Sequence, residues 1–126
     1  MELCTVNGIW HNEIIRMNLT EGTIKALQEH IGKKITERGF DDESLHERLL
    51  LLAEEVGELI HACRKTSGMY TDKNRPSDER PEEEIVDVLN LIFAVAIKMG
   101  VDVETEFIKK EAVIDTRTYG RTQENK

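Results

Sequence analysis

Hydrophobic and polar positions follow a helical period over four segments of this chain, and the first segment begins near Thr20. Its apolar residues recur three or four positions apart, at Ile24, Leu27, Ile31 and Ile35. Gly39 stands where the C-terminus of a helix favours glycine. These signals predict a first helix between Thr20 and Gly39.

A second helix is predicted by the pattern Ser44-Leu-His-Glu47, which matches a capping box and directly precedes a rich apolar run. We expect this helix to continue to about Thr66, because Gly68 follows. The stretch from Gly68 to Arg80 contains Gly, Asn, Pro, Ser and several charges, which is typical of a loop.

The third predicted helix runs from Pro81, which suits a first helical position, to about Met99, with Gly100 closing it. After Glu84 its residues are apolar on nearly every face, so we expect a core helix that is buried on all sides. A last helix is predicted from Asp102 to about Tyr119. Its expected buried stripe consists of Val103, Phe107 and Val113.

The predicted architecture is therefore all-α, a four-helix bundle over one domain of residues 20–120. Residues 1–19 show no sustained period and are interpreted as an N-terminal arm, and residues 121–126 as a flexible tail. Three short helices cannot easily cover a core helix without a polar face. We therefore expect self-association through helix faces into a homodimer or homotetramer.

Charge and composition narrow the classes of partner. The 126 residues include 25 acidic side chains and 17 Lys and Arg, which gives a formal net charge of −8. Such a surface repels phosphate backbones and argues against nucleic-acid binding. No apolar run is long enough for a membrane span, and the first residues lack the basic start of a signal peptide. Cys4 and Cys63 share no metal-binding spacing and are typical of a reducing compartment. We therefore expect a cytoplasmic protein, and no membrane partner.

Five acidic residues on the second and third predicted helices carry the chemistry: Glu54, Glu55, Glu58, Glu84 and Asp87. The first three project within an arc of about 100° on one helical turn, and the last two lie on adjoining turns. Exposed polar faces often contain such pairs, but these pairs are embedded beside strongly apolar runs on consecutive helices. Mg²⁺ accepts carboxylates together with substrate phosphates, so the pattern favours a metal site for a phosphorylated substrate.

The segment Leu52-Ala-Glu-Glu-Val-Gly-Glu-Leu59, followed by Glu84-Ile-Val-Asp-Val-Leu89, resembles the all-α nucleoside triphosphate pyrophosphohydrolases of the MazG type. In that family an EExxE motif and an ExxD motif on consecutive helices hold magnesium. The resemblance, over about residues 20–119, implies four metal ligands: Glu55, Glu58, Glu84 and Asp87. It implies that Glu54 is a catalytic acid that helps to position a second metal or the attacking water.

The activity implied by this resemblance is Mg²⁺-dependent hydrolysis of (deoxy)nucleoside triphosphates to the monophosphate and pyrophosphate, as in nucleotide-pool house-cleaning. Mn²⁺ is a substitute for Mg²⁺. Asn90, three residues after Asp87, is expected to be a buried amide that reads the base or sugar, or caps a backbone group. Further candidates for substrate binding are Lys98, Lys110 and Arg117, which otherwise serve as helix-dipole partners or solvated side chains.

Three alternatives remain open. The related phosphoribosyl-ATP pyrophosphohydrolases have a similar fold and chemistry, although Glu55-Val-Gly-Glu58 looks closer to the MazG type. A non-catalytic nucleotide-binding regulator is the second. The third is a di-iron bundle, because Glu43–His46 and Glu58–His61 match ExxH. Both pairs lie on or at the start of the same predicted helix, whereas a di-iron site needs one on each of two helices.

Overall fold

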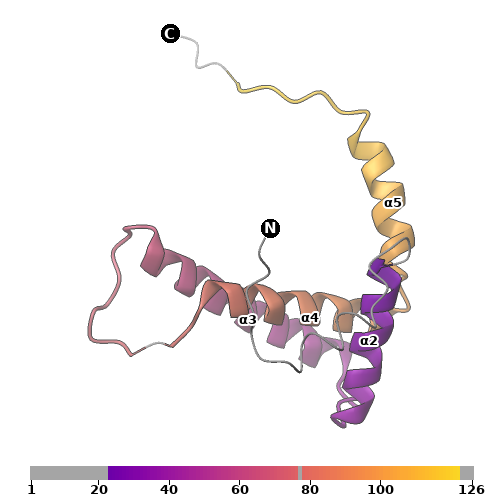
Figure 1. The fold of residues 1–126 in the computed structure, drawn as a ribbon, viewed down its shortest axis with the longest axis horizontal. Coiled ribbons are helices and arrows are strands. Elements are labelled where there is room, and N and C mark those ends of the chain that lie inside the picture. Colours follow the sequence, from indigo (N-terminus) through magenta and orange to yellow (C-terminus); the bar gives the residue numbers. More distant parts are fainter. Residues whose placement is uncertain (1–22, 77, 123–126) are drawn as a thin grey trace, which may run out of the picture.

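The structure, a computed structural model, describes residues 23–76 and 78–122, and this part of the chain contains four α-helices and no strand (Figure 1). The helices are α2 (Thr23–Glu37), α3 (Leu45–Thr66), α4 (Pro81–Met99) and α5 (Val103–Ile114). This confirms the all-α prediction. None of the described helices has the length and apolar character to cross a membrane. The predicted arm, residues 1–19, and most of the tail lie outside the described residues.

Helices α3 and α4 pack against each other more extensively than any other pair of described helices. They run side by side as a hairpin and are connected by residues 67–80 (Figure 1). Helix α2 packs across one end of this hairpin, near the end of α4, and α5 leads away from it. Gln28 of α2 ties α5 in place, because its side-chain amide donates to the carbonyl of Val101 at 2.8 Å and accepts from the N–H of Val103 at 3.0 Å.

The local signals in the sequence set the ends of α3 and α4 as predicted. The Ser44 hydroxyl accepts the N–H of Glu47 at 3.2 Å, and the Glu47 carboxylate accepts the N–H of Ser44 at 2.6 Å, which completes the capping box of α3. Pro81 opens α4. Gly100 closes it with φ 69°, a left-handed conformation in which glycine avoids the clash of a Cβ atom.

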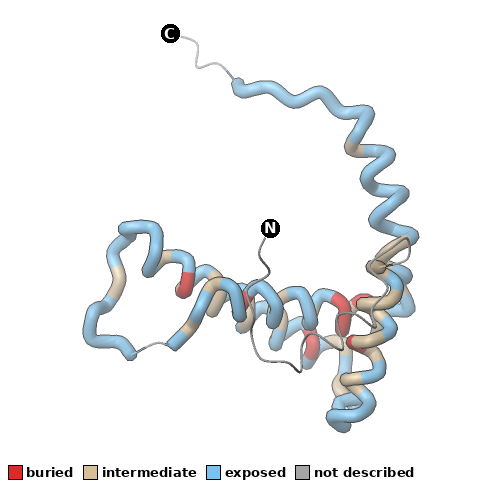
Figure 2. The backbone as a smooth tube through the Cα atoms, viewed as in Figure 1, coloured by how far each residue is buried: buried red, intermediate tan, exposed pale blue. Residues whose placement is uncertain are grey.

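The buried positions gather mainly where α2 meets the hairpin (Figure 2). Phe93, Ala94 and Ala96 of α4 are buried there beside Ile31 of α2. Arg48 of α3 is only 3% exposed, and its guanidinium donates to the carbonyl of Ala94 at 2.6 Å. This buried arginine links the start of α3 to the last turns of α4.

The expectation that α4 is buried on all sides is wrong for the single chain. Ile85, Val86, Leu89 and Ile92 are 40–55% exposed, because α2 and α3 cover only part of the helix surface. The same holds on α3, where Leu50 is 72% exposed. The hairpin therefore presents apolar side chains that no described part of this chain covers.

The last helix also differs from its prediction. It ends at Ile114 rather than near Tyr119, and Phe107 and Val113, predicted to be buried, are about half exposed. Only α2 among the described helices packs closely against α5, so the residues on its other sides meet solvent. Of the predicted stripe, Val103 alone is partly buried.

Candidate active site

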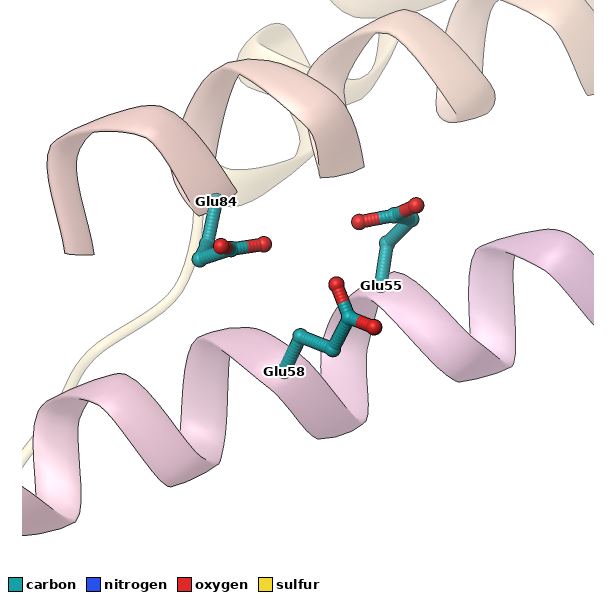
Figure 3. A group of neighbouring side chains, drawn as sticks. All are labelled: Glu55, Glu58 and Glu84. Carbon is teal, nitrogen blue, oxygen red and sulfur yellow. The ribbon is translucent and has the colours of Figure 1, made fainter. Parts of the chain in front are cut away.

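Three carboxylates from two helices converge between α3 and α4. Glu55 and Glu58 lie one turn apart on α3, and Glu84 lies in the first turn of α4 (Figure 3). One oxygen of each carboxylate lies within 4.8 Å of the others. We call these three residues the acidic triad. The hairpin packing creates it, because the sequence separates Glu84 from Glu58 by the whole 67–80 loop.

The acidic triad is poorly compensated. Glu84 is only 7% exposed, and one oxygen each of Glu55 and Glu84 is buried without a hydrogen-bond partner among the described residues. No described Lys, Arg or His forms an ion pair with any of the three. Like charges held this close in a partly desolvated place oppose ionisation.

The pKa values of two of these carboxylates are raised by burial and by the repulsion between them. Burial, followed by the charges of Glu58 and other neighbouring carboxylates, raises the pKa of Glu55 to about 7. Burial and the charges of Glu58 and Asp87 also raise the pKa of Glu84. A group of acids with raised pKa values in one place is a candidate functional site.

The donor set fits a hard divalent cation. It offers carboxylate oxygens only, two of which are buried and unpartnered, and a cation between them would offset the mutual repulsion. Mg²⁺ and Mn²⁺ prefer such ligands. No histidine belongs to this group among the described residues, and His46 and His61 stand about 22 Å apart along α3, so the ExxH pairs cannot share one iron centre.

Two other predicted site residues lie next to the acidic triad. Asp87, one turn beyond Glu84, is exposed and outside the closest group, but its charge raises the pKa of both Glu55 and Glu84. Glu54 is exposed and, with Glu58, lines a cavity of about 290 Å³. The structure thus brings the five predicted carboxylates into one neighbourhood on two helices.

Of the predicted substrate-binding residues, Asn90 lies one turn beyond Asp87 on α4, whereas the three basic residues lie farther from the acidic triad. Asn90 is exposed, so the expectation of a buried amide is wrong, since α2 and α3 leave this part of α4 uncovered. Lys98 lies near the Glu47 carboxylate, whose pKa its charge helps to lower, and stands about 21 Å along α4 from Glu84. Lys110 and Arg117 are exposed on α5 and just after it.

Besides Gly57 and Ile60, four polar residues line the 290 Å³ cavity that were not predicted as site residues: His61, Arg64, Arg75 and Glu79. The first two follow Glu58 along α3 at spacings of three, so helical periodicity was a usable signal for them. The other two come from the 67–80 loop, where no period exists. The Nδ1 atom of His61 contacts the Glu79 carboxylate and joins this loop to α3.

Comparison with protein families matches residues 21–110 to the family described as phosphoribosyl-ATP pyrophosphohydrolase. The match spans most of the chain and includes both acidic motifs. No curated protein matches the chain. The matched family is part of the MazG-like superfamily of all-α nucleoside triphosphate pyrophosphatases, which confirms the resemblance at the superfamily level. It indicates a nucleotide pyrophosphohydrolase and leaves the substrate open.

Without added metal, the protein should lose stability as the pH rises from about 5 to about 8. The pKa of Glu55, about 7 in the fold, lies above its value in the unfolded chain, so over this interval the folded state binds more protons. Urea midpoints measured across this pH range in a chelator check the effect. Glu55→Gln should flatten the dependence, because an amide does not titrate. Glu111→Gln, an exposed control on α5, should retain it. Identical pH profiles for Glu55→Gln and the wild type would contradict the acidic-triad electrostatics.

Proposed function

Because this chain belongs to the phosphoribosyl-ATP pyrophosphohydrolase family, we propose that it hydrolyses the bond between the α- and β-phosphates of a nucleotide, with Mg²⁺ as cofactor. The observation that carries the proposal is the convergence of Glu55, Glu58 and Glu84 between two helices, with buried oxygens that lack partners. Proteins rarely bury such a set unless a cation occupies it.

Two substrate classes are compatible with this site. (Deoxy)nucleoside triphosphates, in a MazG-type house-cleaning role, are favoured by the glycine-bearing segment Glu55-Val-Gly-Glu58. Phosphoribosyl-ATP fits the family match equally well. Both carry a triphosphate, so the acidic triad would act on the same bond, between the α- and β-phosphates, in either substrate. A panel of the two substrate classes, scored by pyrophosphate release with Mg²⁺, distinguishes them.

The proposed ligands of the cation are Glu55, Glu58, Glu84 and Asp87, and Mn²⁺ would be held by the same oxygens. When bound, such an ion neutralises phosphate oxygens and lowers the pKa of a coordinated water. Glu54 lies at the exposed edge of α3 beside Glu58, where its carboxylate accepts a hydrogen bond from the attacking water and orients it. The water oxygen bonds to the α-phosphorus while the water proton passes to the Glu54 carboxylate. The bond from the α-phosphorus to the bridging oxygen breaks, and this oxygen leaves with pyrophosphate.

Self-association is part of the proposal, as a homodimer or homotetramer. The exposed side chains Ile85, Leu89 and Ile92 recur on α4 at spacings of four and three, and Leu50 and Ile60 of α3 are more than half exposed. Large apolar side chains exposed in such number on two packed helices usually mark a protein interface. A second copy of the hairpin offers the same apolar surface in return.

Replacing the proposed ligands should abolish turnover without unfolding the chain. Glu55→Gln, Glu58→Gln, Glu84→Gln and Asp87→Asn each preserve side-chain shape but remove a charged ligand, so kcat should fall by at least about a hundredfold. The losses should not add in double variants. Steady-state kinetics and helical circular dichroism measure both effects, with Glu111→Gln as the exposed control. Near wild-type turnover in two of the four variants would refute the four-ligand assignment.

The position of cleavage tests the reaction class. In ¹⁸O-labelled water the label should appear in the nucleoside monophosphate and not in pyrophosphate, because water attacks the α-phosphorus. Mass spectrometry of the products checks this. Nucleoside diphosphate and orthophosphate as primary products would contradict the proposal. Tight binding of Mg²⁺-nucleotide without any turnover would instead favour the non-catalytic regulator.

The apolar surface of the hairpin predicts an assembly larger than the 14.5 kDa monomer in sedimentation experiments. Introducing a charge by Leu50→Glu or Ile92→Glu should shift the species toward 14.5 kDa, because the charge would be buried in the interface. Met69→Glu places the same charge at an exposed loop position and serves as the control. A wild-type chain that sediments as a monomer at micromolar concentration would exclude the interface.

A further inference from the structure

The 290 Å³ cavity beside the acidic triad is lined by both acidic and basic side chains. Among its lining residues are Glu54, Glu58, His61, Arg64, Arg75 and Glu79. Glu58 belongs to both the acidic triad and the cavity wall, and the charge of Glu79 helps to raise the pKa of Glu84. The cavity is therefore continuous with the proposed metal site.

Arg64 is the cavity residue farthest along α3. It follows Glu58 by six residues, which is about 9 Å along the helix axis, and spacings of four, three and three place Glu54, Glu58, His61 and Arg64 on one face. Its Nη2 donates to the carbonyl of Tyr70 at 2.7 Å, while its Nε is buried and has no partner among the described residues. A guanidinium has five N–H donors; one is used by Tyr70 and one is the buried Nε, so three remain on the two terminal nitrogens for a ligand.

Arg75, from the 67–80 loop, lines the same cavity as Arg64. Within residues 23–76 and 78–122 its side chain forms no hydrogen bond or ion pair, although its backbone N–H donates to the carbonyl of Asp72 at 3.3 Å and so fixes a turn. The loop is attached to α3 at both ends, by Arg64 to Tyr70 and by His61 to Glu79. These attachments hold the loop arginine over the cavity.

The charge balance of the cavity identifies the kind of ligand. Three carboxylates and two guanidinium groups line the cavity. Glu58 belongs to the acidic triad, Glu54 lies one turn before it on α3, and Glu79 contacts His61, so the positive charge that an anion can reach is that of Arg64 and Arg75. Guanidinium groups bind phosphate through paired, charge-assisted hydrogen bonds. Pyrophosphate is the anion that a pyrophosphohydrolase releases, and its charge grows as the bond to the α-phosphate breaks.

We propose that Arg64 and Arg75 bind the β- and γ-phosphates of the substrate and hold the departing pyrophosphate. This inference rests on the proposed function and adds a direction to it. The triphosphate runs along α3 from the level of Glu58 toward the level of Arg64, with the loop arginine closing over its end.

Calorimetric titration of the full chain with magnesium pyrophosphate, and separately with nucleoside monophosphate, tests the assignment without requiring turnover. Arg75→Gln should weaken pyrophosphate binding by about tenfold, because one charge-assisted phosphate contact is lost. Monophosphate binding should change by less than about twofold, since that product occupies the acidic end. Arg64→Gln should act in the same direction, and Arg64→Lys should restore part of the affinity.

Lys73→Gln is the matched control, because it removes a positive charge from an exposed position of the same loop that does not line the cavity. It should leave both affinities unchanged. Arginine variants that bind pyrophosphate like the wild type, or that lose affinity for both products equally, overturn the subsite. If the arginine variants lose affinity for pyrophosphate only, but the wild type shows no turnover, the subsite is supported and the proposed function is refuted. If the wild type turns over substrate and the arginine variants bind pyrophosphate normally, the proposed function stands and the subsite is refuted.

Discussion

The packing of three carboxylates against one another in the α3–α4 contact is the constraint on which the rest of the site depends. Burying Glu84 next to Glu55 and Glu58 opposes folding in the absence of a cation, because each charge disfavours the ionised form of the others. The hairpin tolerates the arrangement because its stability comes from elsewhere, at the crossing of α2 and in the contacts of buried Arg48. The N-terminus of α4 also favours a negative charge at Glu84.

Local signals made the ends of α3 and α4 predictable, because each signal rests on residues that are neighbours in the sequence. The capping box of α3, Pro81 and Gly100 act within one turn of the chain. Burial is different. Periodicity shows which side of a helix is apolar but not which element covers it, so the exposure of Leu89 and Phe107 could not be read from the pattern. Both lie on helices with fewer partners than their apolar surfaces require.

The same distinction explains which site residues were predicted. The carboxylates of α3 and α4 share faces of regular helices, so spacing alone brought them together, and the hairpin then joined the two sets. Arg75 and Glu79 reach the site from an aperiodic loop whose path depends on contacts such as His61 with Glu79. Lys98 was a reasonable phosphate contact on charge alone, but the helix carries it away from the acidic end toward Glu47.

The two substrate classes remain compatible because they share every group that, in our proposal, the acidic triad and the arginines would contact. A triphosphate and a scissile α–β bond are common to both, so residues that discriminate between them must contact the base or the added ribosyl phosphate, beyond the α-phosphate. Along α3 that direction is opposite to Arg64, toward the exposed apolar surface of the hairpin. If a second copy covers that surface, as proposed, the specificity of the enzyme depends on its assembly, whereas the triphosphate contacts belong to one chain. Such a division would allow relatives with similar acidic motifs to differ in substrate through the interface alone.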